Sequence, residues 1–389
     1  MIRLARITLR EIHLPLVEPF ETSAGVVEAR RILLLDLADT DGGSTWSECV
    51  AEALPTYSPD TVDSSWLALS EWIIPIALGE AFSAPRDAHA ALDRSIRGNR
   101  MPRAAVEMGI WSLFALQRKL SLAALLGAES GTSGDSPVRP REFVETGIAL
   151  GMHATPDALV ERALAAADEG YRRIKLKIAP GRDVQFAGAV RDAVPKNVAV
   201  TVDANGSYSL DNAAHRSMLE KLDTLGLAMI EQPLAHDDLV YHAELQQLLT
   251  TPICLDESIS SDARAEEMLA LGSARIVNLK PGRVGGFEQA LAIHDRCARA
   301  EIPVWCGGML ESGIGRAHNV ALASLPNFSL PGDLSPSARY WARDIVRDPW
   351  TMDAAGRVSV PLAEPGPGFD VDVDFVDEIT VRSATFDVR

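Results

Sequence analysis

Lysine is scarce in this chain of 389 residues, and its scarcity draws attention to the few lysines present. Of the 37 basic residues only six are lysine, so arginine carries most of the positive charge. Two of the six, Lys175 and Lys177, lie in one short apolar run, 173–178. A lysine at a strand end is ordinarily a solvated tip, but its pKa can be tuned towards neutrality, which arginine does not allow. Like-charge repulsion is expected to depress the pKa of each lysine, which would make a usable general base.

Cysteine, long apolar runs and net positive charge are also lacking. The four cysteines form no CxxC pair and no ligand-like spacing with histidine, which indicates free thiols in a reducing cytoplasm. No apolar run approaches the roughly 20 residues of a membrane span, and the N-terminus has no signal-peptide core. The net charge of −17 disfavours nucleic acid and anionic membranes as partners. We expect a cytoplasmic protein.

The first part of the chain mixes strand and helix patterns. Apolar and polar residues alternate over 2–17 and 29–38, and the apolar spacing becomes helical from about 59 to 126, which indicates an α+β domain. The polar, glycine-marked stretch 19–25 between the two alternating runs predicts a loop. The stretch 129–140, rich in glycine, serine and proline, predicts a linker.

After this linker, short apolar runs alternate with helical stretches, as parallel strands with crossover helices do. The runs recur every 24–28 residues, one βα unit each, which favours a closed barrel over an open doubly wound sheet. We therefore predict an α/β protein in which a catalytic β/α barrel spans 141–360. An α+β capping domain at 1–140 would be completed by the C-terminal tail, 361–389, whose last residues alternate again.

Charged residues stand at the ends of successive apolar runs. They are Lys177, Asp203, Glu231, Asp256 and Lys280. One strand-end carboxylate more often caps the next helix, but five charges in phase are hard to obtain by accident, and catalytic groups converge at this face of a parallel barrel. Three carboxylates from adjacent strands form an oxygen-ligand set for a hard cation such as Mg²⁺. Lysines flanking them suit removal of a proton next to a carboxylate, with the metal stabilising the enediolate.

Short motifs surround these charged residues, namely Lys175-Leu176-Lys177, Asp203-Ala204-Asn205, Glu231-Gln232-Pro233, Asp256-Glu257-Ser258 and Lys280-Pro281-Gly282-Arg283. Together they resemble the motifs of the enolase superfamily, in its muconate-cycloisomerase-like branch, whose members use a lysine or histidine base with Mg²⁺. The later stretch from Trp305 to Asn319 is similar to the o-succinylbenzoate synthase/N-succinylamino acid racemase subfamily.

The resemblance implies a role for each matching residue. Lys177 and Lys280 would be the acid/base pair, and Asp203, Glu231 and Asp256 would be the ligands of Mg²⁺, for which Mn²⁺ can substitute. A second group would support the site or bind substrate, and it consists of Lys175, Asn205, Arg283, Gly307, Gly308, Met309 and Phe20. In that group Lys175 would tune Lys177, and Arg283 resembles an arginine associated with racemising members.

The expected reaction is that of o-succinylbenzoate synthase, a dehydration in menaquinone biosynthesis that begins with abstraction of a proton next to a carboxylate. N-succinylamino acid racemase, alone or as a second activity, is the alternative, ahead of another cycloisomerase or a dipeptide epimerase of the superfamily. A metal-free aldolase with a Schiff base on Lys177 leaves the three carboxylates unexplained. A non-catalytic binding protein has no use for the paired lysines. With the resemblance in view, we expect a homo-oligomer that acts on a small-molecule carboxylate.

Overall fold

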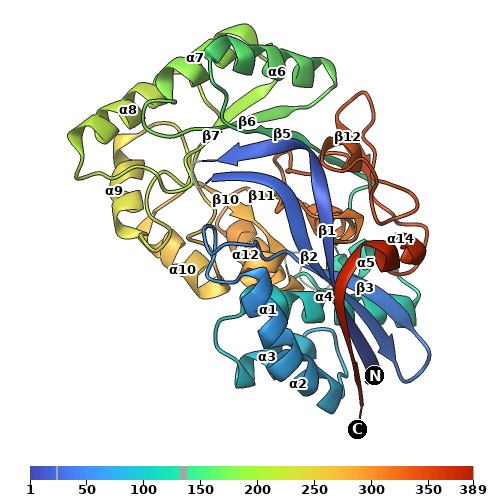
Figure 1. The fold of residues 1–389 in the computed structure, drawn as a ribbon. Helices are drawn as coiled ribbons and strands as arrows, with labels where there is room; N and C mark the ends of the chain where they lie inside the picture. The colour runs from blue at the N-terminus through green and yellow to red at the C-terminus, as the bar shows by residue number, and fades with distance from the viewer. Residues whose placement is uncertain (23–24, 132–137, 389) are drawn as a thin grey trace.

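The structure is a computed structural model that describes residues 1–22, 25–131 and 138–388. Figure 1 shows an antiparallel sheet with its helices at one end of the molecule and a curled parallel sheet with its helices at the other. The centre of the predicted linker lies outside the described residues. None of the described helices is long and apolar enough to cross a membrane.

The antiparallel sheet has the strand order β13-β1-β2-β3. Its strands are β1 (Leu4–Thr22), β2 (Gly25–Asp39), β3 (Ser44–Cys49) and β13 (Thr380–Asp387). The two predicted alternating runs therefore form strands. The predicted loop at 19–25 is wrong for residues 19–22 and 25, because Phe20 pairs with Val27 and Thr22 pairs with Gly25. Its residues 23–24 lie outside the described part of the chain. The end of β1 lies outside the apolar core, and backbone pairing with β2 holds it extended. The polar composition of this stretch therefore does not indicate whether it is a strand or a loop.

Helices cover one side of this sheet. They are α1 (Val62–Ala68), the π-helical turn η1 (Leu69–Ile73), α2 (Ile74–Gly79), α3 (Asp87–Ser95), α4 (Arg100–Arg118) and α5 (Leu122–Glu129). Residues 101–115 of α4 are all buried. Gly109 allows α4 to approach the sheet closely, since a Cβ at this position would come within 2.7 Å of Leu37 Cδ1.

The parallel sheet has seven strands in the order β11-β10-β9-β8-β7-β6-β5. They are β5 (Gly147–Leu150), β6 (Arg173–Lys177), β7 (Ala199–Asp203), β8 (Ile230–Glu231), β9 (Ile253–Leu255), β10 (Ile276–Leu279) and β11 (Val304–Cys306). The helices that connect or follow them are α6 (Pro156–Asp168), α7 (Val184–Ala193), α8 (Ala213–Asp223), α9 (Val240–Leu248), α10 (Asp262–Leu271), α11 (Pro281–Val284), α12 (Phe287–Arg299) and α13 (Gly313–Ala323). The sequential strand order is that of a barrel, whereas a doubly wound sheet reverses its order at a switch point.

An irregular segment completes the ring between β11 and β5. Val304 of β11 bridges to Phe328, and Thr146, next to β5, bridges to Gly332. The Gly147 amide also donates to the Gly332 carbonyl at 2.7 Å. The segment therefore takes the place of an eighth strand, and it carries Asp333 into the barrel mouth. Beside it, β4 (Phe143–Glu145) pairs with β12 (Arg357–Ser359), and η2 (Ser337–Arg339) is a 3₁₀ turn.

The C-terminal tail returns to the first sheet. Strand β13 pairs antiparallel with β1, from Arg6 opposite Asp387 to Ile12 opposite Thr380, and the two termini lie near each other in Figure 1. Helix α14 (Val373–Ile379) precedes the strand, so only the last part of the tail is extended. The domain boundary at residue 140 stays a prediction.

Two buried carboxylates join the first sheet and its helices to the barrel. Glu107 of α4 accepts hydrogen bonds from the amides of Phe287 at 2.7 Å and Glu288 at 2.9 Å, at the start of α12. Glu48 of β3 accepts from Ser312 Oγ at 2.6 Å and from a further amide in the first turn of α13. The first amides of a helix lack partners within it and favour an acidic group. Burial nevertheless raises the pKa of Glu107 to about 8 and of Glu48 to about 7.

We predict that Glu107→Ala lowers the free energy of unfolding by about 1–3 kcal/mol, because two buried amides lose their acceptor. Glu107→Gln keeps one acceptor oxygen and the side-chain volume, so it should cost less. Between the ordinary pKa of 4.5 and about 8 the folded protein binds more protons at Glu107 than the unfolded chain. Its contribution to stability therefore falls as pH rises through this window, and Glu107→Gln should flatten that slope. Denaturant unfolding from pH 5 to 9 measures both effects, and equal curves for all three proteins would contradict the assignment.

Candidate active site

The five charged residues of the predicted constellation lie together at one end of the parallel sheet. Lys177 is opposite Asp203 in the β6–β7 pair, and Asp203 is opposite Glu231 in the β7–β8 pair. Asp256 directly follows β9, and Lys280 directly follows β10. All five side chains are therefore held by the carboxyl ends of consecutive parallel strands, the face where barrel proteins place their reacting groups.

Lys177 is held by two oxygen atoms from β7 and the residues after it. Its Nζ lies 2.6 Å from Asp203 Oδ2 and 2.7 Å from Asn205 Oδ1. The Asn205 amide nitrogen in turn donates to Glu257 Oε1 at 2.9 Å. Asn205 adopts a left-handed backbone with φ of 44°, a conformation that asparagine tolerates better than most residues. Asn205 thus connects Lys177 with Glu257 across the mouth.

Lys175 lies one layer deeper on the same face of β6. Its Nζ is 2.8 Å from Asp333 Oδ2 and 3.4 Å from both Asp203 Oδ2 and Glu231 Oε2. Burial on its own lowers the pKa of Lys175, but these three carboxylates outweigh it and the pKa rises above its ordinary value. The expectation that the neighbouring lysine depresses the pKa of Lys175 is therefore wrong, since attraction to the carboxylates exceeds the repulsion.

Lys280 is positioned by a residue from the first domain as well as by the barrel. Its Nζ donates to Asp256 Oδ2 at 2.9 Å and to the Tyr57 hydroxyl at 3.1 Å. Tyr57 donates in turn to Asp256 Oδ1 at 2.7 Å. Burial on its own lowers the pKa of Lys280. The charges of Asp256 and Tyr57 have a larger effect in the opposite direction, so the pKa lies well above its ordinary value.

Arg283 lies behind Asp256 rather than in the cavity wall. Its guanidinium contacts the Asp256 carboxylate and donates to the carbonyls of Asn278 at 2.6 Å and Ile259 at 2.9 Å. Burial on its own raises the pKa of Asp256, but Lys280 and Arg283 hold it well below the usual range. Of the two roles expected for Arg283, support of the site matches this geometry, and direct contact with a ligand does not.

The three carboxylates face cationic side chains in this structure. Within the described part of the chain, no three acidic, histidine or cysteine side chains have the spacing of a closed metal site. Glu231 Oε1 accepts from Asn278 Nδ2 at 2.7 Å, whereas Glu231 Oε2 is buried without a hydrogen-bond partner. Burial and the nearby Asp203 raise the pKa of Glu231 to about 8. Three buried carboxylates with one unsatisfied oxygen are a donor set that fits a hard divalent cation.

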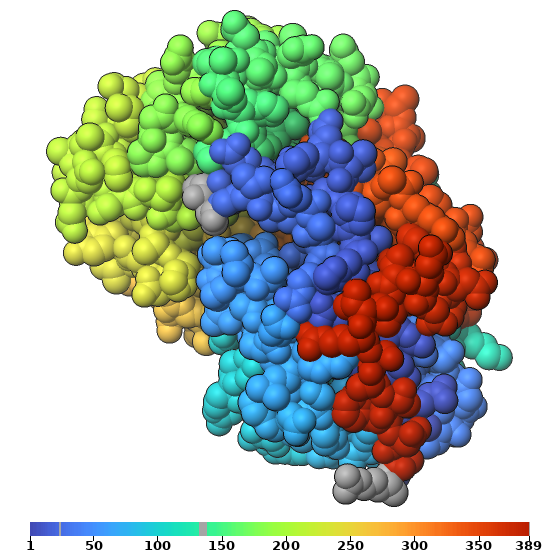
Figure 2. Space-filling model, in the orientation of Figure 1, coloured from blue at the N-terminus to red at the C-terminus, as the bar shows by residue number. Residues whose placement is uncertain are grey.

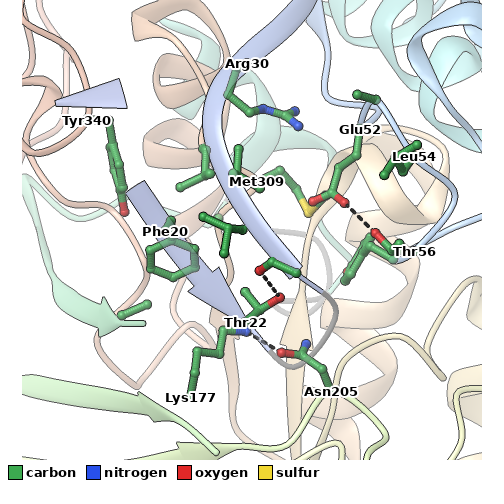
Figure 3. Close-up of a pocket in the computed structure, with 18 of the residues that line it drawn as sticks. Phe20, Thr22, Arg30, Glu52, Leu54, Thr56, Lys177, Asn205, Met309 and Tyr340 are labelled. Carbon is green, nitrogen blue, oxygen red and sulfur yellow. Dashed lines mark hydrogen bonds between the residues drawn. The ribbon is translucent and has the colours of Figure 1, made fainter. Parts of the chain in front are cut away.

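A cavity of about 340 Å³ lies between the barrel mouth and the β1–β2 hairpin. Figure 2 shows this hairpin, in dark blue, lying across the near face of the barrel. The wall is shared between the two parts of the chain. The barrel contributes Lys175, Lys177, Lys280, Asn205, Gly308 and Met309, and the first domain contributes Phe20, Arg30 and Tyr57. Figure 3 shows Phe20 and Met309 projecting into the cavity with Lys177 and Asn205 along its edge. Of the predicted pocket residues, Gly307 lies behind the wall, against Asn278 and Lys280.

Sequence reasoning missed three residues that contact the predicted set. Asn278 precedes Lys280 by two positions, so the alternation of a strand was the signal that could have placed it beside Glu231. Tyr57 lies in a loop of the first domain, and Asp333 lies in the irregular segment after β11. Neither position has a periodic pattern that a sequence can reveal, because the contact depends on how distant segments pack.

The fold and the site define the class of protein. A parallel barrel carries carboxylates and lysines at the carboxyl ends of its strands, under a cap built from both termini. A family model described as the mandelate racemase/muconate lactonizing enzyme N-terminal domain matches residues 5–127, and an enolase C-terminal domain-like model matches residues 158–375. The chain therefore belongs to the enolase superfamily.

Individual relatives are similar over nearly the whole chain. An o-succinylbenzoate synthase of Geobacillus kaustophilus is 44% identical over 385 residues, which cover 99% of this chain and 98% of that protein. An N-succinylamino acid racemase of an Amycolatopsis species is 43% identical, with 97% and 98% covered. A crystal structure of an enolase-superfamily member from Listeria innocua has a TM-score of 0.92 at 37% identity, with 100% of each chain covered.

We predict that Gly307→Ala destabilises the protein by about 1–3 kcal/mol through overpacking. A Cβ at Gly307 would come within 2.1 Å of Asn278 Oδ1 and 2.5 Å of Lys280 Cε. The matched variant Gly308→Ala should cost less, because its nearest contact is the Asp333 carbonyl at 3.0 Å. Thermal and denaturant unfolding measure the difference. Equal stability of the two variants would show that Asn278 and Lys280 are not held against this glycine.

Proposed function

We propose that this protein is an o-succinylbenzoate synthase, an enzyme that dehydrates a hydroxylated carboxylate after abstracting the proton next to that carboxylate. The observation that carries the proposal is that Lys177 and Lys280, from opposite sides of a carboxylate cluster, line one cavity, with Lys175 deeper in its wall. Relatives named o-succinylbenzoate synthase, at 41–44% identity over the full chain, support the choice of substrate.

The side chains divide the work of this reaction. Lys177, oriented by Asn205, takes the α-proton of the substrate and returns it to the departing hydroxyl. The Lys280 ammonium, held by Asp256 and Tyr57, stabilises negative charge that develops on the substrate carboxylate. Asp203, Glu231 and Asp256 would hold Mg²⁺, or Mn²⁺ in its place, which supplies Lewis-acid stabilisation of the enediolate when bound. The hairpin and Met309 exclude water from the reacting end.

N-succinylamino acid racemisation is the second candidate, and a specific observation favours it. Lys177 on β6 and Lys280 after β10 are separated by three intervening strands, yet both line the same cavity. Two bases on opposite sides of one α-carbon are what a racemase requires. Relatives named N-succinylamino acid racemase, at 43% and 42% identity, support this activity beside the synthase.

Other parts of the proposal concern context. The synthase role would assign the chain to menaquinone biosynthesis in the cytoplasm, and we propose a homo-oligomer. We also propose that residues 1–140 with 361–389 form the capping domain and that 141–360 form the barrel domain. The pairing of β13 with β1 supports the inclusion of the tail in the cap.

Metal dependence is the first test. We expect EDTA to abolish turnover and Mg²⁺ to restore it, because the cation held by the three carboxylates would supply the stabilisation of the enediolate. Asp203→Asn, Glu231→Gln and Asp256→Asn should each weaken Mn²⁺ binding, measured by calorimetry, by at least about 10-fold. The exposed Asp211→Asn makes the same chemical change outside the cluster and should bind Mn²⁺ like the parent. Full turnover in excess EDTA would exclude the proposed metal role.

Arginine substitutions of the two lysines separate charge from proton transfer, since arginine keeps its charge but is not a base at neutral pH. Lys177→Arg should lose synthase activity by about 10²–10⁴-fold, whereas Lys280→Arg should retain part of it. For an N-succinylamino acid in D₂O, each variant should exchange the α-proton of only one enantiomer, and the two variants should prefer opposite enantiomers.

The exposed Lys196→Arg is the matched control, and it should leave both activities unchanged. The proton exchange is followed by NMR and the dehydration by absorbance. If both site variants still exchange both enantiomers, the two-base assignment is wrong. If the parent turns over N-succinylamino acids but does not form o-succinylbenzoate, racemisation replaces dehydration as the function.

A further inference from the structure

Arg30 is a buried cation at the edge of the cavity with no acidic partner. Its side chain lines the cavity wall, and the residue is only 3% exposed. Nη2 donates to the carbonyls of Val50 at 3.1 Å and Ala51 at 3.3 Å. The buried Nε has no hydrogen-bond partner, and no ion pair involves Arg30 within residues 1–22, 25–131 and 138–388. Burying a charge without a counter-charge is costly, so the site is built for an anionic group.

The neighbouring arginine shows the contrast on the same strand. Arg31, the next residue along β2, also borders the cavity, but it forms ion pairs of 2.7 Å with both Glu11 and Asp63. Glu52, also in the cavity wall, directly follows the two residues whose carbonyls bind Arg30. Its carboxylate accepts a hydrogen bond from Thr56 Oγ1 at 3.4 Å and forms no ion pair with Arg30. Arg30 therefore lacks the neutralisation that its neighbour has.

The position of Arg30 relative to the lysines indicates the shape of the ligand. Figure 3 shows Arg30 projecting from β2 on the side of the view opposite Lys177 and Asn205, with Met309 between them. The cavity thus has a charged reacting end on the barrel and the apolar Met309 in its middle. At the cap end the wall contains Arg30, together with Arg31, which is paired with Glu11 and Asp63, and with Glu28 and Glu52, which form no ion pair with Arg30. Its volume of about 340 Å³ is in the range that holds a small ligand.

We propose that Arg30 binds the second carboxylate of a dicarboxylate substrate whose first carboxylate lies at the reacting end. The inference rests on the proposed function, in which this second carboxylate is the end of the succinyl arm. A guanidinium already fixed by two backbone carbonyls loses little freedom on binding, and charge-assisted hydrogen bonds are strong where water is excluded. Arg30 is then a specificity-determining residue that selects succinylated over merely acylated substrates.

A pair of substrates that differ in one group tests this role. N-succinyl and N-butyryl derivatives of one amino acid share an acyl chain of four carbons, and only the first ends in a carboxylate. Exchange of the α-proton with D₂O in the Mg²⁺-loaded enzyme gives kcat/KM for both. Arg30→Gln should lower kcat/KM for the succinyl compound by about 10- to 100-fold, mainly through KM. The value for the butyryl compound should stay within about twofold.

Two further variants separate recognition from support of the backbone. Arg299→Gln makes the same charge change at an exposed position outside the cavity wall and should leave the preference for the succinyl compound unchanged. Arg30→Lys keeps the positive charge and should retain part of the preference. An equal loss for both substrates in Arg30→Gln would overturn the proposal, because it would show that Arg30 only holds the Val50 and Ala51 backbone.

Ligand binding keeps the test independent of turnover. Calorimetry on the parent should find that succinate binds the Mg²⁺-loaded protein at least about 10-fold more tightly than butyrate, and Arg30→Gln should remove the difference. Equal affinity of the parent for the two acids would overturn the role of Arg30 even if the variant did not fold. The parent could instead bind succinate preferentially, exchange the α-proton of neither acyl amino acid and form no o-succinylbenzoate. That result would contradict the proposed function and leave the anion site at Arg30 supported.

Discussion

The ammonium of Lys175, buried among Asp203, Glu231 and Asp333, is the interaction on which the site depends. Carboxylates on adjacent strands lie so close that they repel one another, and burial adds a desolvation cost to each. Lys175 offsets both effects because its ammonium lies among these carboxylates. The ammonium also lies over the Trp305 ring, with its Nζ 4.9 Å from the ring centroid. The charged mouth is therefore part of the folded barrel rather than a group of side chains placed on its surface.

The second constraint is the docking of the cap onto the barrel. Glu107 and Glu48 cap the first turns of α12 and α13, and these contacts fix the cap close to the strands that bear Lys280 and Cys306. Tyr57 then reaches Asp256 and Lys280 from the cap. The cavity wall is shared between two parts of the chain, so the proposed catalytic end and the proposed anion-binding end at Arg30 depend on their docking as much as on the residues themselves.

Much of the architecture could be predicted because barrel strands recur with a regular period. That period carried Lys177, Asp203, Glu231, Asp256 and Lys280 to the same level of successive parallel strands, and the structure has them there. The hairpin was harder, since Phe20 lies beyond the apolar core and only pairing with Val27 makes it a strand residue. The pKa of Lys175 was also misjudged, because the sequence around Lys175 gives no sign of Asp333, which is 158 residues further along the chain.

The sequence by itself determined the barrel, the phase of its charged strand ends and the family motifs, because these depend on spacing along one continuous segment. Tertiary structure alone decided that Tyr57 contacts Lys280, that Asp333 joins Lys175, that Arg283 lies behind Asp256, and that Arg30 is buried without an acidic partner. Each of these depends on how distant segments pack, and a hydrogen bond or a desolvated charge is defined by its surroundings in space. Local patterns place residues on an element, whereas their electrostatics follow from what the other elements bring against them.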